Sequence, residues 1–295
     1  MAEQLKPIEI GSVYPPIGAV LIIGNGLVGS CLAKDFGVTP VDYPQVDIVN
    51  PIVTWDLVKS FPGELVINAA GKTKVDEAER EKDMGRDGSY YRVNVLGNRH
   101  LAQACLEFKK YFVSISSEMA FGEGEKGQLR LESEVPEVHI AERGVYGGTK
   151  AWGEFEILTY FAKEGRGINL RISHPSKRSE GWFFNLIKKY SKLHDDSEIT
   201  PTLTEELSHV IAQAYVLGIS RRTLHAVGTV VTPYEFGTAG RKRLGITGET
   251  EPIHFENVKS KAYRPQFGAL SNEYTQKLLG LRFRDSQEQI DYLTS

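Results

Sequence analysis

The chain has 295 residues, of which 41% are hydrophobic and 25% are charged, and its formal net charge is −3. These values are typical of a globular protein with one large domain, or a main domain with a smaller one attached. The nearly balanced charge gives no electrostatic reason to expect nucleic acid or an anionic membrane as a partner. Composition and charge therefore argue against the strongly basic classes of binding protein.

Cysteine usage and apolar segments bound the compartment. Cys31 and Cys105 lie in apolar, helix-like stretches, and no Cys/His cluster has metal-ligand spacing, so no metal site is expected. Reduced, buried thiols suit a reducing compartment. No segment approaches the ~18 apolar residues of a transmembrane helix, and the first residues lack the apolar core of a signal peptide. We therefore expect a cytoplasmic protein without a membrane partner.

Residues 1–16 contain three prolines and no clear periodicity, which indicates an irregular N-terminal extension. The β-branched run 19–23 then predicts a buried parallel strand. This strand leads into the sequence Gly24-Asn25-Gly26-Leu27-Val28-Gly29, followed by a helix-like segment. Gly24 would permit the tight turn, Gly26 the approach of a pyrophosphate, and Gly29 the packing of helix on strand. The pattern predicts dinucleotide binding; the alternative is a glycine-rich turn without a ligand.

Acidic residues follow the next expected strand, 38–42. Asp42 ends this strand, where an acidic side chain would bind the ribose 2′-hydroxyl of NAD, unless it is an ordinary loop aspartate. Asp47 and Ile48 lie in the short loop that follows and are candidates for the adenine end. No arginine follows closely to hold the 2′-phosphate of NADP. The sequence leaves the choice between NAD and NADP open.

Two further predicted strands end in residues suited to a ligand. Strand 65–67 runs into Asn68-Ala69-Ala70, whose small side chains let a flat cofactor lie close to the backbone. Strand 111–115 runs into Ser116 and Ser117, whose hydroxyls would point into the ligand crevice unless they cap the loop. Asn94 is a polar residue within the apolar helix 91–108. It must be hydrogen-bonded, either to anchor a neighbouring strand or at the site.

Tyr146 and Lys150 lie four residues apart at the start of a predicted helix, and hence on one helical face. An ammonium beside a phenol favours the phenolate, so we expect the pKa of Tyr146 to be lowered toward working pH. A packed tyrosine and a solvated lysine would also meet this spacing. The glycine loop and the strand ends upstream favour a proton-delivery centre instead.

Strands and helices alternate up to residue 173, which predicts an α/β fold, a Rossmann-like doubly wound parallel sheet, for residues 17–173. Strand 168–173 alternates apolar and polar residues and is expected to be half-exposed. Residues 174–295 predict a smaller, mainly helical C-terminal substrate lobe, some of whose segments return to the main sheet. Helix starts are expected at 202–205, 232–235 and 286–289, where each sequence offers a cap.

The chain resembles the extended short-chain dehydrogenase/reductases, and within them the dTDP-4-dehydrorhamnose reductase group. The segments that carry the resemblance are 66–79, 93–94, 115–121, 145–154, 170–173 and 201–202. The chain departs from the group at four places: its glycine loop is one residue shorter, the segment between the second and third expected strands is short, Met119-Ala120 stands where Tyr-Val is usual, and His174-Pro175 replaces the usual continuation near the sugar. These departures indicate an altered cofactor pocket and, even more, an altered sugar pocket.

The resemblance implies reduction of the C4 ketone of a nucleotide-activated 4-keto-6-deoxysugar by NADPH or NADH. Tyr146 would supply the proton, and Lys150 would hold the nicotinamide ribose. Ser117 would bind the carbonyl oxygen, with Ser116 as the fallback, and Lys72 would lie near the nicotinamide half of the dinucleotide. The residues expected to bind the nucleotide sugar are Ser117, Glu118, His174, Trp182 and Arg264, the last as the diphosphate partner. A homodimer is the candidate assembly.

The residues expected around the dinucleotide are Gly24, Asn25, Gly26, Leu27, Val28, Gly29, Asp42, Asp47, Ile48, Asn68, Ala69, Ala70, Lys72, Asn94, Ser116, Tyr146 and Lys150. Two other functions remain open. Some relatives of this group are non-catalytic and regulate a partner enzyme, as in the β subunit of methionine adenosyltransferase. A nucleotide-sugar epimerase or dehydratase of the same superfamily is the other alternative. A dehydratase usually has an acidic pair at the strand end, whereas this chain has only Glu118 followed by Met119.

Overall fold

The computed structural model describes residues 5–10, 18–136, 138 and 144–295. A five-stranded parallel sheet forms its centre, in the order β2-β3-β4-β5-β9. The strands are β2 (Val20–Ile23), β3 (Leu65–Asn68), β4 (Tyr111–Ser117), β5 (Arg166–Ile172) and β9 (Arg222–His225). Because the strands are parallel, their carboxyl ends meet at one edge of the sheet, the usual place for a ligand in such a fold.

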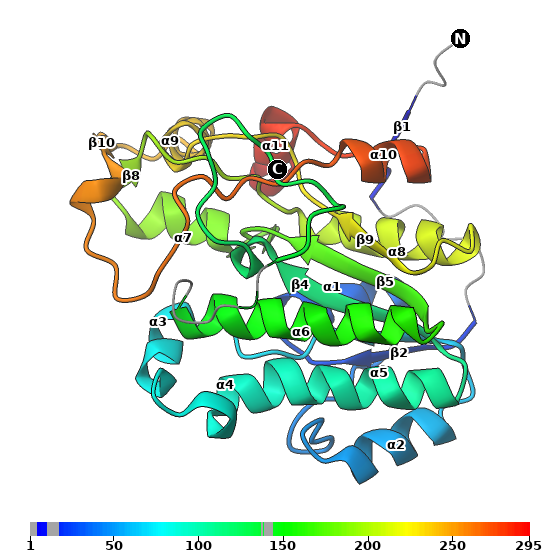
Figure 1. Cartoon of the computed structure of the whole chain (residues 1–295). Coiled ribbons are helices and arrows are strands. Elements are labelled where there is room, and N and C mark those ends of the chain that lie inside the picture. Colours follow the sequence, from blue (N-terminus) through cyan, green and yellow to red (C-terminus); the bar gives the residue numbers. More distant parts are fainter. Residues whose placement is uncertain (1–4, 11–17, 137, 139–143) are drawn as a thin grey trace.

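Helices cover both faces of this sheet (Figure 1). One face carries α2 (Pro51–Ser60), α5 (Asn98–Glu107) and α6 (Gly144–Ala162), and the other carries α1 (Leu27–Phe36) and α8 (Leu207–Val216). Neighbouring residues of a strand point to opposite faces. Val66 therefore packs in the core under α2, α5 and α6, and Ile67 packs in the core under α1 and α8. Both faces are buried, which explains the continuous apolar runs. The predicted Rossmann-like doubly wound sheet is confirmed.

The second expected strand is wrong. Residues 38–42 contribute only a single bridge, Ile23 to Val41, held by the Gly24 N–H on the Val41 carbonyl (2.7 Å) and the Val41 N–H on the Ile22 carbonyl (2.9 Å). Pro40 has no N–H to donate, which prevents a longer ladder.

The half-exposed character expected of strand 168–173 is also wrong. β5 is buried from residue 167 to 172 because it lies between β4 and β9. Its polar residues Asn169 and Arg171 are almost completely buried. Apolar and polar residues do alternate along β5, but both kinds are buried, so the alternation does not mark a solvent-exposed face.

The C-terminal half forms a separate hydrophobic core, the C-terminal core, beside the sheet (Figure 1). It is formed by α7 (Trp182–Lys189), α9 (Pro233–Arg243) and α11 (Ser286–Thr294), with buried residues that include Phe183, Phe236 and Ile290. The paired strands β8 (Lys192–His194) and β10 (Glu251–Ile253) lie beside them. Other segments return to the main unit, namely α8, β9 and α10 (Glu273–Leu279), whose Leu279 joins the sheet core.

The helix starts expected near 232 and 286 are confirmed, but the expected cap is found only at the first of them, where Thr232 and Glu235 form a capping box at α9. Thr202 instead serves the sheet edge, where its hydroxyl accepts from the Ser173 N–H (3.0 Å) and donates to the Ala226 carbonyl (2.7 Å). The 3-10 turn Thr204–Glu206 then leads into α8. At α11 the capping box is formed by Asp285 and Glu288. Several short polar residues near each start could cap, and tertiary contacts decide which one does.

Shorter elements complete the described chain. They are α3 (Val75–Ala78), α4 (Ser89–Tyr91), a π-helical segment Arg92–Gly97, the 3-10 turn η4 (Glu118–Ala120) and the hairpin of β6 (Ser176–Lys177) and β7 (Glu180–Gly181). None of the helices in the described ranges combines the length and apolar content needed to cross a bilayer.

The N-terminal segment differs from the irregular extension that we expected. Residues Lys6–Pro7 form β1, which pairs in parallel with β11 (Leu281–Arg282). Ile8 follows and is buried in the sheet core, with 3% exposure. The rest of the expected extension, 1–4 and 11–16, lies outside the described residues. The first described strand, β1, therefore pairs with a strand near the other end of the sequence, β11.

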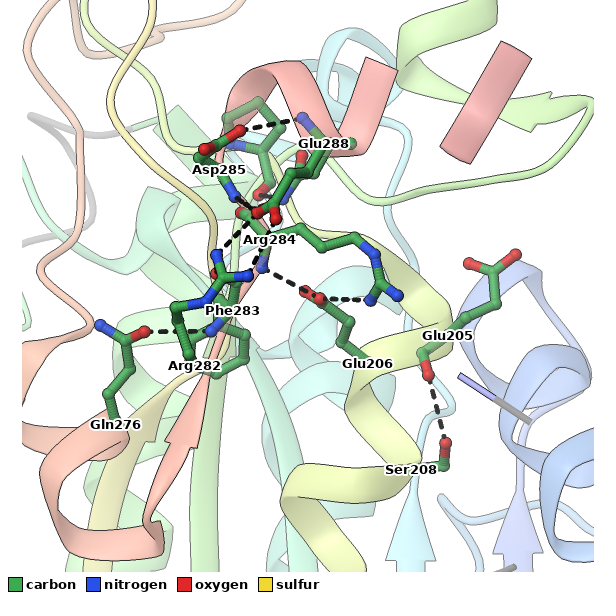
Figure 2. A network of polar contacts seen from close by, with 11 residues as sticks. Glu205, Glu206, Ser208, Gln276, Arg282, Phe283, Arg284, Asp285 and Glu288 are labelled. Carbon is green, nitrogen blue, oxygen red and sulfur yellow. Dashed lines mark hydrogen bonds and ion pairs between the residues drawn. The ribbon is translucent and has the colours of Figure 1, made fainter. Parts of the chain in front are cut away.

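A network of charged groups near β11 joins the sheet unit to the C-terminal core (Figure 2). Arg284 donates from its backbone and its guanidinium to Glu206 (3.1 and 2.9 Å), which is almost completely buried. Arg282 binds Glu288 of α11 through two hydrogen bonds (2.7 and 2.8 Å). Burial raises the pKa of Glu206 to about 7, although the bonds from Arg284 oppose this shift. The network ties the last helix to the start of α8.

Candidate functional site

The glycine loop 24–29 lies against the end of β3. Gly24 has φ +99°, and a Cβ atom there would lie 2.4 Å from the Ala70 nitrogen, so any other residue would be strained and would clash. A Cβ atom on Gly29 would lie 1.9 Å from the Gly24 carbonyl oxygen. These contacts explain why glycine is required at both positions.

Gly26 is different, because a Cβ atom there would meet nothing within 4 Å. It is the N-cap of α1, no side chain caps this end, and the first turn carries no acidic residue. The first N–H groups of a helix have no partner inside the helix, and the helix dipole is positive at this end. An open, uncapped helix start beside a flat strand end fits the pyrophosphate of a dinucleotide.

The acidic candidates are partly used by the fold. Asp42 accepts from the backbone N–H groups of Asn25 (2.9 Å) and Tyr43 (2.8 Å), so it holds the glycine loop in place. Asp47 accepts from the N–H of Val49 (2.9 Å) in a local turn. Ile48 is buried in the core. Asp42 thus lies beside the glycine loop. It also has a purely structural task there, which agrees with the alternative that it is an ordinary loop aspartate.

Asparagines organise the end of β3. Asn68 accepts from the Ala70 N–H (3.1 Å) and donates to Asn98 (3.0 Å). Asn94 binds both backbone groups of Lys72 (2.8 and 3.0 Å) and donates to Thr149 of α6 (3.1 Å). We had expected Asn94 either to anchor a neighbouring element or to face the site. Its hydrogen bonds show that it anchors the segment after β3 to α6.

The side chain of Lys72 is engaged away from the strand ends. Its ammonium donates to Ser89, lies 4.7 Å from the centre of the Tyr90 ring and is 4.0 Å from the Glu81 carboxylate. The place that we expected for it, near the nicotinamide half of the dinucleotide, has no support from these contacts.

Tyr146, Lys150 and Ser117 come together where β4 ends against α6. The hydroxyl of Ser117 lies close to that of Tyr146, which is buried with 7% exposure. The Lys150 ammonium donates to the Ile115 carbonyl of β4 (3.2 Å). The Tyr146 ring packs with Tyr90, Met119 and other residues of a small apolar cluster. The spacing of four residues therefore places both side chains toward the same strand end.

The expected lowering of the Tyr146 pKa is wrong for the ligand-free protein. Burial raises this pKa, the Glu118 carboxylate raises it further, and the nearby Ser117 hydroxyl opposes the shift. Burial also lowers the pKa of Lys150 to about 8, against the attraction of the Glu154 and Glu118 carboxylates. Desolvation thus dominates the pKa of Tyr146, and it keeps the tyrosine in its protonated form.

Three of the expected substrate residues adjoin this centre. Glu118 accepts from the Ser117 hydroxyl (2.7 Å), and its other oxygen lies 3.7 Å from Nδ1 of His174. The His174 ring meets Trp182 edge-on, with 4.6 Å between the ring centres. Burial lowers the pKa of His174 to about 4, so the imidazole is neutral near pH 7 and its contact with Glu118 is not an ion pair. Burial raises the pKa of Glu118 to about 7.

Arg264 lies at the edge of this group. Its guanidinium binds both carboxylate oxygens of Asp76 (3.0 and 3.1 Å) and donates to Ser260. These bonds lower the pKa of Asp76. Arg264 also contributes to the low pKa of His174, which places its charge near that ring. The pair links the C-terminal half to the loop after β3.

Several residues around this centre were missed by the sequence analysis. Ser116 was expected to serve the ligand, but its hydroxyl donates to Glu154 of α6, which in turn receives the guanidinium of the buried Arg171. A glutamate four positions after Lys150 on the same helix was the available signal. For Asp76 and Tyr90 the sequence offered no comparable sign, because their partners are distant in the chain.

A cluster of possible metal ligands lies on the C-terminal half, where none was expected. Asp195, Asp196 and His254 each offer one atom, all within 4.8 Å of one another. His254 lies 3.5 and 3.4 Å from the two carboxylates. These contacts account for the cluster without an ion. Metal-ligand spacing could not reveal it, since 58 positions separate His254 from Asp196.

The fold and the site define a Rossmann-type protein with an uncapped, glycine-rich helix start and, where β4 ends against α6, a buried tyrosine and serine and a partly buried lysine. The model of the family described as "RmlD substrate binding domain" matches residues 17–294. The chain belongs to this family, which confirms the family predicted from the sequence.

Individual relatives agree. The chain is 30% identical over 293 residues to a dTDP-4-dehydrorhamnose reductase of Aggregatibacter actinomycetemcomitans, covering 91% of this chain and 95% of that protein. A crystal structure of a dTDP-4-dehydrorhamnose reductase from Clostridium acetobutylicum is similar at a TM-score of 0.80 and 25% identity, covering 93% and 98% of the two chains.

A further solved structure, the dTDP-4-dehydrorhamnose reductase of Bacillus anthracis in complex with NADP, is similar in fold at a TM-score of 0.78 and 23% identity, covering 92% and 96% of the two chains. The predicted homodimer and the cytoplasmic location stay predictions.

Proposed function

We propose that this protein reduces the 4-keto group of a nucleotide-activated 4-keto-6-deoxysugar, with NADPH or NADH as the reductant. The observation that carries the proposal is the assembly of Ser117, Tyr146 and Lys150 at the end of β4, on the same edge of the sheet as the open start of α1 that follows β2. The name of the Aggregatibacter relative, which shares 30% identity over almost its whole length, supports the substrate class.

In this proposal a bound dinucleotide supplies the hydride. The uncapped start of α1 binds its pyrophosphate through free backbone N–H groups. Residues 68–70 offer small side chains and a turn fixed by the Asn68 hydrogen bonds, against which a flat ring can lie. Asp42 accepts ribose hydroxyls in addition to its two backbone bonds, since a carboxylate has further lone pairs. Lys150 holds the ribose on the nicotinamide side.

Tyr146 acts as the proton donor. As the C–H bond forms at the ketone carbon, negative charge develops on the ketone oxygen, and the phenol transfers its proton to that oxygen. The high pKa of Tyr146 suits an acid that must hold its proton until this charge appears. Ser117 turns its proton from Glu118 to the oxygen and donates a second hydrogen bond there, and the Lys150 ammonium offsets the charge left on the phenolate. Burial strengthens each of these electrostatic contacts.

The sugar lies, in this proposal, against Glu118, His174 and Trp182. Glu118 and the neutral His174 offer hydrogen-bond groups for sugar hydroxyls, and Trp182 offers an apolar face. Arg264 binds the diphosphate, for which its guanidinium must share or leave its contact with Asp76. Residues 17–173 then bind mainly the dinucleotide and residues 174–295 mainly the sugar nucleotide.

The test is a panel of nucleotide-linked 4-keto sugars, each incubated with purified protein and NADPH or NADH. The expected result is loss of nicotinamide absorbance and formation of a 4-hydroxy sugar with at least one member. Binding of dinucleotide without oxidation by any member would contradict the proposal and would favour a regulatory subunit. A parallel titration with the two dinucleotides gives the cofactor preference.

A further inference from the structure

Behind the proton-delivery centre lies a buried ion pair that the proposed reaction does not use. Arg171 of β5 is 1% exposed, and it donates three hydrogen bonds to the Glu154 carboxylate at 2.7 to 3.1 Å. Its remaining donors reach the Glu134 carbonyl (2.8 Å) and His225 of β9 (3.1 Å). The guanidinium also lies 4.5 Å from the centre of the Phe121 ring. A charge held this firmly fixes the position of its partner, Glu154.

Glu154 faces the catalytic strand end. It follows Lys150 by one helical turn, and both residues line a cavity of about 10 Å³ beneath Ser116. Lys150 donates to the carbonyl of Ile115, and the next residue, Ser116, donates to Glu154. Two side chains one turn apart on α6 therefore hold two successive residues of β4, immediately before Ser117.

We propose that Glu154, held by Arg171, is a positioning residue of this centre: its carboxylate keeps Lys150 in the charged form, and its bond to Ser116 fixes the strand end that presents Ser117. The inference rests on the proposed reductase function, because it concerns the same Lys150. A charged Lys150 is needed to stabilise the phenolate that remains after proton transfer. Glu154 itself does not contact the reacting atoms.

The electrostatic surroundings of Lys150 support this role. The carboxylates that raise its pKa against burial are Glu154 from its own helix and Glu118 from η4. Glu118 has a pKa of about 7, so it is partly protonated near neutral pH, whereas Glu154 is bound by a guanidinium. The polar groups of the other packed elements that line the same cavity are uncharged: Asn68, Asn94, Asn98, Ser114 and Ser116. Arg171 and, behind it, His225 complete the charged or titratable groups on the sheet side.

The experiment is the pH dependence of kcat/KM for Glu154→Gln, with the full chain and a keto-sugar nucleotide that the wild type reduces. Loss of the carboxylate favours neutral Lys150, so the alkaline limb of the profile should move to lower pH by about one unit. Glu156→Gln is the matched control: it lies on the same helix and pairs with Arg99 near the surface, and its profile should keep the position of the wild type. A purely structural role would lower activity at every pH without moving the limb.

Glu154→Gln leaves Arg171 without a charged partner and could prevent folding. The double variant Glu154→Gln with Arg171→Met removes both charges together, and the same shift of the limb is expected. The titration midpoint of Lys150, followed by NMR with ε-13C-labelled lysine and assigned with Lys150→Arg, should fall in parallel. This midpoint is measurable without turnover, so failure of the proposed reaction remains distinguishable. An unchanged midpoint and limb in a folded variant would overturn the inference.

Discussion

The proposed dinucleotide side and the proposed sugar side of the site are built in different ways. On the dinucleotide side, backbone contacts and buried amides hold the groups: Gly24 meets Ala70 directly, and Asn94 binds the backbone of Lys72. On the sugar side, contacts between side chains from distant segments do so, such as His174 with Trp182 and Arg264 with Asp76. The first arrangement tolerates little change, whereas the second can vary at small cost to the fold.

This difference places chemistry and specificity in separate parts of the protein. The positions at which this chain departs from the family, Met119 and His174, lie on the proposed sugar side or at its border. Both residues sit among neighbours that accept them: Met119 packs with Tyr146, and Ser173 hydrogen-bonds His174 (2.8 Å). Four experiments test how far the contrast holds.

The largest effect is expected for Tyr146→Phe. Phenylalanine keeps the ring that packs with Tyr90 but removes the proton donor, so kcat should fall by about 10² to 10⁴-fold. The Kd of the dinucleotide, measured by fluorescence titration, should stay nearly unchanged. A variant with wild-type turnover would remove Tyr146 from its proposed role.

Gly24→Ala tests the rigidity of the dinucleotide side. A methyl group would be strained at φ +99° and would clash with Ala70, so the free energy of unfolding should fall by about 1–3 kcal/mol or more. Gly26→Ala is the matched control, because its methyl group meets open space. It should melt like the wild type and yet bind dinucleotide more weakly, as the methyl group would occupy the approach to the pyrophosphate. Full stability of Gly24→Ala in chemical denaturation would contradict the contrast.

The arrangement of the glycine loop and the strand ends could be predicted from sequence because its signals are local. A glycine loop between a strand and a helix, an Asn-Ala-Ala strand end and a Tyr-Lys spacing each lie within a few residues, and the sheet brings the strand ends together. The pKa of Tyr146 could not be predicted, because desolvation depends on what covers the ring in three dimensions.

The partners of polar side chains were also out of reach. The polar residue Arg171 in β5 was taken as a sign of exposure. It is in fact buried, in an ion pair with Glu154 and a hydrogen bond with His225. Thr202 was taken as a helix cap, although it bonds Ser173 and Ala226. In both cases a local pattern was satisfied by residues far away in the chain, which a single sequence does not reveal.

His225 links both sides, since its ring bonds Arg171 and the Ser271 carbonyl (2.7 Å). Burial lowers its pKa to about 3, so the folded protein holds it neutral while the unfolded chain takes up a proton below pH 6.5. The stability contributed by the neutral ring is therefore present above pH 6.5 and is lost as the pH falls. From pH 6.5 to 5 the loss amounts to about 2 kcal/mol. Urea unfolding should show a smaller loss over this interval for His225→Gln than for the wild type; equal losses would contradict this assignment.

The smallest effect on the fold is expected for Arg264→Gln. Its ion pair with Asp76 is partly exposed, so the free energy of unfolding should change by less than about 1 kcal/mol. The KM for the nucleotide sugar should rise by roughly tenfold, as expected for one lost charge-assisted bond, with the Kd of the dinucleotide unchanged. Asp76→Asn weakens the same contact but keeps the guanidinium, and it should retain most of the sugar-nucleotide affinity. Equal increases in KM for both variants would mean that the ion pair, and not Arg264 as a diphosphate ligand, shapes the sugar side.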